Sequence, residues 1–135
     1  MNMWVTQFGH WHPSNSGFDG YITLFRVLDQ SNINNMHFGA GIDGQWNYQS
    51  LPSAIQLTAG EDYIIGSIWT TGGYYFGTGG QPEFRPTSGP WTYVQMDYCN
   101  SCTPTTFPTQ TLNGYTYGVA TFTYELSAPG IVGNE

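Results

Sequence analysis

The fold of this chain is decided by the stretch Gly44-Gln45-Trp46-Asn47-Tyr48-Gln49-Ser50-Leu51 and, after Pro52, by Ile55-Gln56-Leu57-Thr58-Ala59-Gly60-Glu61-Asp62-Tyr63-Ile64-Ile65-Gly66. The first stretch alternates aromatic and polar side chains, as a strand with two different faces does. Gly60 lies in a Leu-Thr-Ala-Gly turn, where its freedom to adopt a positive φ suits a tight reversal. Because β-branched and aromatic residues fill both flanks, the segment predicts a meander of strands.

The rest of the chain repeats this all-β rhythm, with glycines and prolines between short apolar or alternating segments. No window keeps the apolar repeat of a helix. The spacing predicts an all-β protein, an antiparallel, jelly-roll-like β-sandwich, as a single domain over residues 1–126, followed by a Gly/Pro-containing tail over 127–135. We expect the long last strand to be central in its sheet. The expected strands are Met3–Phe8, Tyr21–Leu28, His37–Gly41, Gln45–Ser50, Ala54–Leu57, Asp62–Thr70, Tyr74–Phe76, Tyr93–Cys99 and Tyr115–Leu126.

The composition is low in charge for a globular protein. Only 8% of the 135 residues are charged, lysine is absent, and the net charge is −7, whereas an average domain has about a quarter charged residues. Such a surface repels phosphate backbones, which excludes nucleic acid as a partner. No apolar run is long enough to span a membrane, and no signal peptide is visible. Abundant uncharged polar residues with 17% aromatics are typical of secreted adhesins, glycan-binding modules and fibre subunits, so we expect an extracellular or cell-surface location.

The segments quoted above resemble one domain family. Gln45-Trp46-Asn47-Tyr48-Gln49-Ser50-Leu51 and Leu57-Thr58-Ala59-Gly60-Glu61-Asp62-Tyr63-Ile64-Ile65-Gly66-Ser67 are similar to the core of a β-sandwich domain of unknown function in bacterial exosortase-sorted (PEP-CTERM) surface proteins. Val5-Thr6-Gln7-Phe8-Gly9-His10-Trp11-His12 is similar to its upstream motif, with His12 where the family usually has Asp. The resemblance covers residues 3–126. It implies a sandwich fold and a surface setting but no reaction.

Cys99 and Cys102 are the two cysteines of the chain and form a Cys-x-x-Cys motif. A redox-active pair of this spacing normally opens a helix, whose N-terminus lowers the thiol pKa, but no helix is predicted here. A zinc ribbon would need a second pair. We therefore interpret the two as a disulfide that closes a turn in an oxidising compartment, with a free thiol pair as the alternative.

His10 and His12 are two residues apart, so on a strand they share one face, as the imidazoles of many β-barrel metal sites do. The following residues lack the glutamate that a cupin motif would add, and His37 lacks the setting of a second motif. The alternative, which we favour, is a solvated strand end beside a proline turn.

Asp19, Asp43 and Asp62 lie in or beside expected turns. Carboxylates are preferred calcium ligands, so these three are candidates for a structural calcium site. The alternative is that they are ordinary turn formers, and beyond such an ion we expect no cofactor. No nucleophile motif, phosphate-binding loop or evident carboxylate pair occurs in the sequence, so we expect no catalytic activity.

Aromatic residues near glycine-rich segments are the main candidates for binding. Flat aromatic rings stack on the C–H faces of sugars, while amide side chains hydrogen-bond their hydroxyls. Aromatic residues also dominate protein interfaces. The candidates for glycan or partner contact are Trp11, Tyr74, Tyr75, Phe76 and Trp91.

Three classes of function follow from these observations. We favour a non-catalytic structural protein that self-associates into a matrix or filament, because its sheet edges have few charges to repel a matching strand. Identical subunits are then the expected partners, with polysaccharides second. The alternative is a carbohydrate-binding module, and a hydrolase has no positive signal.

Overall fold

The computed structural model describes residues 2–12, 19–39, 41–42, 44–71, 77–78, 90–91, 97–98, 102–111, 115–116 and 120–128. At 69–71, 77–78, 97–98 and 115–116 only the backbone is described. No described residue lies in a helix. The strands are β1 (Met3–His12), β2 (Asp19–Arg26), β3 (Asn32–Phe38), β4 (Gln45–Leu57), β5 (Tyr63–Thr71), β6 (Gly77–Thr78), β7 (Asp97–Tyr98), β8 (Gln110–Thr111), β9 (Tyr115–Thr116) and β10 (Ala120–Glu125).

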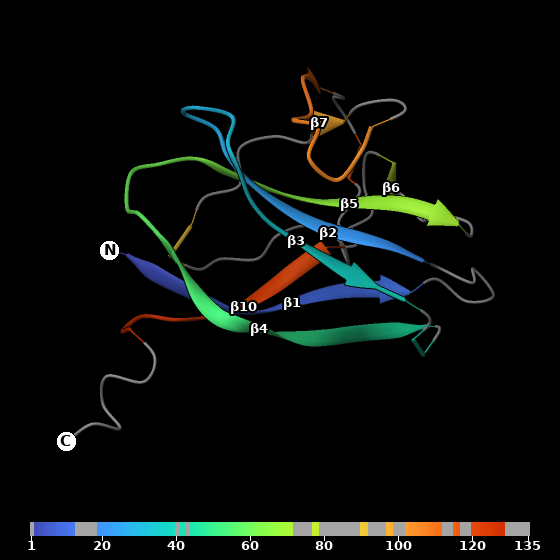
Figure 1. Cartoon of the computed structure of the whole chain (residues 1–135), viewed down its shortest axis with the longest axis horizontal. Helices are drawn as coiled ribbons and strands as arrows, with labels where there is room; N and C mark the ends of the chain where they lie inside the picture. Colours follow the sequence, from blue (N-terminus) through green and yellow to red (C-terminus); the bar gives the residue numbers. More distant parts are fainter. Residues whose placement is uncertain are drawn as a thin grey trace.

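The larger strands form two antiparallel sheets of three strands each, in the orders β10-β1-β4 and β3-β2-β5. Figure 1 shows them as two layers, with β2 and β5 above β1 and β4. β1 contacts β2, and β10 contacts β5, so the sheets stack face to face. Two short antiparallel pairs, β6 with β9 and β7 with β8, accompany them. The prediction of an antiparallel β-sandwich is confirmed.

The core lies between the two sheets and is filled from the inward positions of the central strands, and on β1 the alternation shifts by one residue at the irregularity between Val5 and Gln7. On β1, Phe8 is fully buried and Val5 is 1% exposed, and on β2, Ile22 is fully buried. Burying one such side chain contributes about 1.5–3 kcal/mol. The buried apolar cluster consists of Met3, Val5, Phe8, Ile22, Leu24, Phe38, Leu51 and Leu57.

The prediction of two separate strands around Pro52 is wrong, because β4 runs through this residue without a break. The pairing with β1 shifts from Val5↔Ile55 to Gln7↔Ser50, so residues 51–54 of β4 lie opposite a single residue of β1. Proline has no N–H for a ladder bond and is tolerated in a strand at such an irregularity or at an edge. Pro52 has both, and β4 bends there instead of ending.

The prediction of a long central strand over Tyr115–Leu126 is also wrong. The described part of this segment contains β9 and β10 as separate strands, and β10 is an end strand that pairs with β1. The central strand is β1, which pairs with β10 on one side and β4 on the other. The predicted strand His37–Gly41 is displaced too, because β3 starts at Asn32 and ends at Phe38. Of the predicted strand Tyr93–Cys99 only β7 is described, and Tyr74–Phe76 lies outside the described residues.

Tight turns join strands that follow one another in the chain, β2 to β3 within one sheet and β4 to β5 between the two sheets. Gly60 has a φ of 83°, which confirms the predicted positive φ between β4 and β5. Between β2 and β3, Gln30 has a φ of 57°, and the backbone N–H of Ser31 donates to the Asp29 carboxylate at 3.1 Å. The Ser31 hydroxyl also donates to this carboxylate, at 2.7 Å, and this hydrogen bond, together with that of the Ser31 N–H, lowers the pKa of Asp29. The guanidinium of Arg26 pairs with Glu61 and so connects the two turns.

Candidate functional site

The outer face of the sheet β10-β1-β4 carries aromatic and polar side chains in register. On β1 the inward-facing residues Phe8, His10 and His12, all buried, alternate with Gly9 and Trp11. Since side chains alternate across a strand, Gln7 and Trp11 belong to the outer face, as do the residues directly opposite them. The cross-strand pairs on this face are Trp11↔Trp46, Gly9↔Tyr48 and Gln7↔Ser50 on β4, and Gly9↔Thr121 and Gln7↔Thr123 on β10.

Three aromatic rings occupy one half of this face. The rings of Trp11 and Trp46 meet edge to face, with centroids 5.7 Å apart and an interplanar angle of 71°. Tyr48 follows on the same face of β4 and is 49% exposed. Its ring lies directly over Gly9, because a Cβ added there would be 2.6 Å from the Tyr48 Cε1 atom and 2.8 Å from the Thr121 Cγ2 atom. Gly9 therefore provides the space that the Tyr48 ring occupies.

A row of uncharged hydrogen-bonding groups continues the face beyond the rings. The Gln7 Nε2 atom donates to the Ser50 hydroxyl at 3.3 Å. The Thr123 hydroxyl donates to the Gln7 Oε1 atom at 3.3 Å and shares a 2.9 Å hydrogen bond with the Thr6 hydroxyl. The row thus crosses all three strands, and its side chains are held in place by one another. We use the name aromatic face for Trp11, Trp46 and Tyr48 together with Gln7, Ser50 and Thr123.

One lateral side of the sandwich is formed by two uncharged end strands. β1 faces β2 and β10 lies against β5, so the strand orders put β4 and β3 on the same side. Neither strand contains Asp, Glu, Lys or Arg. Within the described residues, β4 pairs only with β1 and β3 only with β2. Each strand therefore has one side that no described strand pairs.

His10 and His12 share one face of β1, as predicted, but the expectation of a solvated strand end is wrong. His10 is fully buried and His12 is 1% exposed, because the second sheet covers them. Their Nδ1 atoms are 3.3 Å apart. The His10 Nε2 atom is 3.0 Å from the Ser67 hydroxyl of β5, and the His12 Nε2 atom is 3.2 Å from the Gly39 carbonyl oxygen. The pair connects β1 to the opposite sheet through polar contacts.

The chemistry of this pair follows from its burial. Both ring nitrogens of His12 face carbonyl oxygens, that of Gly39 and, at 3.3 Å, that of His10. His10 is fully buried and faces the His12 ring, so a positive charge on His10 is disfavoured. Burial and the neighbouring His12 lower the pKa of His10 from 6.5 to about 3. His10 therefore stays neutral above that pH in the folded protein. Within the described residues, no group of three or more His, Cys, Asp or Glu side chains is arranged to hold a metal ion.

The three candidate calcium ligands do not form one site. Asp19 is the first residue of β2 and pairs with His37, whereas Asp62 precedes Tyr63, which lies opposite Arg26 at the other end of β2. Strands rise about 3.3 Å per residue, so the two carboxylates are separated by most of the length of the sheet. Asp43 lies outside the described residues. The structure therefore does not bring Asp19 and Asp62 together around one ion.

The structure places the predicted contact residues in different environments. Trp11 is on the aromatic face. Trp91 instead packs against β10, with its ring centroid 5.3 Å from that of Phe122 and 5.1 Å from that of Tyr124, beside the core. Tyr74, Tyr75 and Phe76 lie outside the described residues. Tyr48 is not among the contact residues predicted from the sequence, although its alternation with Trp46 in the stretch that decides the fold is a signal for it.

Cys102 is disulfide-bonded. Cys99, the other cysteine of the sequence, lies outside the described residues. The pairing of these two residues therefore stays a prediction.

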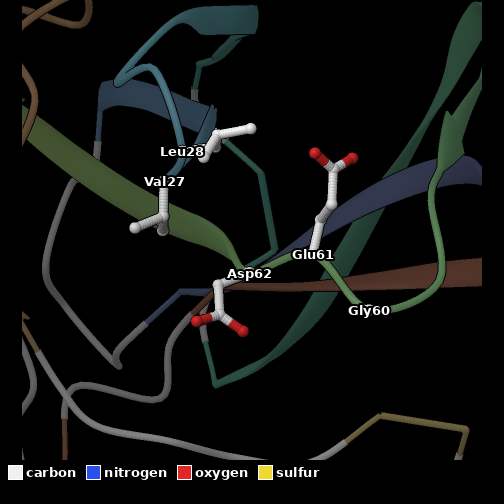
Figure 2. Close-up of a pocket in the computed structure, with 5 residues that line it drawn as sticks. All are labelled: Val27, Leu28, Gly60, Glu61 and Asp62. Atoms are coloured by element: carbon white, nitrogen blue, oxygen red, sulfur yellow. The ribbon is translucent and has the colours of Figure 1, made fainter.

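A surface hollow of about 260 Å³ lies between the two turns described above, lined by Val27, Leu28, Gly60, Glu61 and Asp62. Figure 2 shows the carboxylates of Glu61 and Asp62 pointing in different directions rather than toward a common point. Glu61 is paired with Arg26, and the Asp62 carbonyl accepts the Val27 N–H at 3.0 Å. The hollow contains no convergent set of polar groups, so it is not the candidate site.

The comparisons with known proteins identify no relative: no family model, curated protein or solved structure matches the chain. The resemblance to the exosortase-sorted surface proteins thus stays a prediction. Among the residues described, none belongs to a helix with the length and hydrophobicity needed to cross a bilayer.

Proposed function

We propose that this protein is a non-catalytic domain of the cell surface or extracellular space that associates with copies of itself into a matrix or filament. The observation that carries the proposal is the pair of uncharged end strands, β3 and β4, on one side of the sandwich. A strand at a sheet edge offers backbone N–H and C=O groups to another strand, and natural proteins usually protect such edges with charges. In the two strands themselves, as far as the structure describes them, that protection is reduced to Pro52 and the bend around it.

The usable part of the β4 edge is its first half. Residues 45–50 pair regularly with β1, whereas the shift in register after Ser50 distorts the ladder. Asn and Gln residues are frequent in both strands, and stacked amides add hydrogen bonds when strands pair. Pairing of β4 with a second β4 would close a dimer, whereas pairing with a different edge such as β10 would propagate into a filament unless the rotation closes a ring.

Two further observations support the setting and the lack of catalysis. The disulfide at Cys102 fits an oxidising compartment. Two of the three histidines, His10 and His12, are buried between the sheets, where a substrate in solvent does not reach them. The third, His37, is paired with Asp19 on the surface.

The experiment compares Gln49→Lys with Ser127→Lys, two exposed positions that change the net charge equally. Gln49 is in the regular half of β4, whereas Ser127 follows β10. Light scattering and negative-stain electron microscopy of the intact chain should show assemblies that Gln49→Lys shifts toward the monomer and Ser127→Lys leaves intact. A strictly monomeric intact chain at high concentration, or equal loss in both variants, would reject the proposal.

A further inference from the structure

The aromatic face combines features that suit a sugar polymer. Its three rings lie on two adjacent strands, Trp11 on β1 and Trp46 and Tyr48 on β4. The polar row of Gln7, Ser50 and Thr123 crosses the sheet at the next outward position along these strands. Successive outer positions on a strand are about 7 Å apart, so rings and hydrogen-bonding groups follow one another at intervals along a flat sheet. Pyranose rings present the same two chemistries, apolar C–H faces and hydroxyls, side by side.

The charge of the face restricts the ligand further. Gln7, Ser50, Thr123 and the three aromatic residues carry no charge at neutral pH, and β4 as a whole contains no Asp, Glu, Lys or Arg. The chain has a net charge of −7, which repels an anionic polymer, and none of the described residues of this face is a cation that offsets the repulsion. The face is therefore complementary to an uncharged ligand.

The exposed ring at the centre of the face is Tyr48. It is 49% exposed, and it is supported from below by the Gly9 backbone, which approaches closely because it lacks a side chain. A ring held against a backbone loses little side-chain freedom when a ligand stacks on it, which favours binding. The Trp11–Trp46 pair fixes the neighbouring rings in the same way.

From this arrangement we infer that the aromatic face is a binding site for a neutral polysaccharide, lying along β4 over Tyr48. The occupant is an extended chain of uncharged hexopyranose units, with the rings of Trp46 and Tyr48 under its C–H faces and Gln7 and Ser50 at its hydroxyls. The site is distinct from the β3 and β4 backbone edges, since it uses side chains perpendicular to the sheet. Self-association and glycan binding are thus separate functions of one domain.

The experiment measures depletion of the intact protein from solution by microcrystalline cellulose and insoluble chitin, with alginate gel as an anionic polysaccharide. We expect binding to at least one neutral polymer and none to alginate. Tyr48→Ala should weaken binding about tenfold or more, as for other aromatic hot spots, while Tyr48→Phe, which keeps the ring, should bind like the unmodified chain. Gly9→Ala keeps every ring but places a Cβ 2.6 Å from the Tyr48 Cε1 atom, so it should also weaken binding.

The matched control is Tyr21→Ala. Tyr21 is an aromatic residue of the other sheet, with its ring 5.2 Å from that of His37, and its removal should leave binding unchanged. Far-UV circular dichroism establishes that each variant is folded. Binding to none of the neutral polymers, preference for alginate, or equal loss in Tyr21→Ala and Tyr48→Ala would overturn the inference. It would also be overturned if Tyr48→Ala dissolved the assemblies seen by light scattering, because the face would then contact protein.

Discussion

The interior of the sandwich has two ends with different chemistry, although a single strand, β1, lines both. Near the start of β1, Met3 and Val5 pack in an apolar cluster with Leu57. Near its end, His10 and His12 occupy equivalent inward positions and are just as buried. The apolar end is stabilised by removal of surface from water, whereas the polar end depends on hydrogen bonds that must stay satisfied.

This difference teaches that burial alone does not describe the core. Apolar contacts have no direction, so the first end tolerates small shifts of the sheets. The histidine contacts have direction: His10 must meet the Ser67 hydroxyl and His12 the Gly39 carbonyl. Gly41 packs against the same group, since a Cβ there would be 3.0 Å from the His12 Nε2 atom. The polar end therefore specifies how the two sheets align.

The largest expected effect comes from the apolar cluster. Phe8→Ala removes a fully buried ring from the middle of β1 and should lower the free energy of unfolding by about 3–5 kcal/mol, through lost burial and the cavity left behind. Urea denaturation monitored by tryptophan fluorescence measures it. Leu28→Ala, at a residue that is 76% exposed, is the control and should change stability by less than about 0.5 kcal/mol. Similar losses in both variants would contradict the assignment of the core.

A second effect should appear at the polar end when the pH falls. The pKa of His10 is lowered to about 3 in the folded protein, whereas the unfolded chain binds this proton near the ordinary pKa of 6.5. The unfolded state therefore takes up more protons below that pH, and the folded state loses stability as the pH falls from 6.5 toward 3. The slope for one group is about 1.4 kcal/mol per pH unit, so urea denaturation at pH 7.5 and pH 5 should differ by about 2 kcal/mol.

The control for the pH effect uses the two kinds of histidine in the chain. His10→Gln removes the buried titrating group and should flatten the pH dependence, whatever its effect on stability at neutral pH. His37→Gln changes a surface histidine paired with Asp19 and should leave the contribution of His10 in place. If His10→Gln kept the full slope, the acid sensitivity would come from other groups.

The sequence predicts part of the difference between the two ends of the interior, but not the burial of the two histidines. The alternation around His10 and His12 correctly predicted that they share a face, and Gly60 correctly predicted the turn. Which face is buried depends on the second sheet, and Ser67 belongs to a strand far from β1 in the sequence. Periodicity within one strand contains no information about what covers it.

The aromatic face shows the same limit. Trp46 and Tyr48 alternate visibly, but the contact between Tyr48 and Gly9 exists only through the register of β4 against β1. That register shifts around Pro52. From the sequence alone, the proline suggests a break between two strands. Trp91, by contrast, was predicted to be a contact residue because it lies near a glycine-rich segment, and it packs on Phe122 and Tyr124 instead.

The smallest expected effect isolates one polar contact between the sheets. Ser67→Ala removes the hydroxyl 3.0 Å from the His10 Nε2 atom but leaves the apolar cluster untouched. A single hydrogen bond contributes about 0.5–1.5 kcal/mol, so the free energy of unfolding should fall by about 1 kcal/mol in urea at pH 7.5. Ser53→Ala, at an exposed position of β4, is the matched control and should have almost no effect. If the two variants were equally stable, the hydroxyl would contribute nothing, and the polar end would align the sheets only through the contact of His12 with the Gly39 carbonyl.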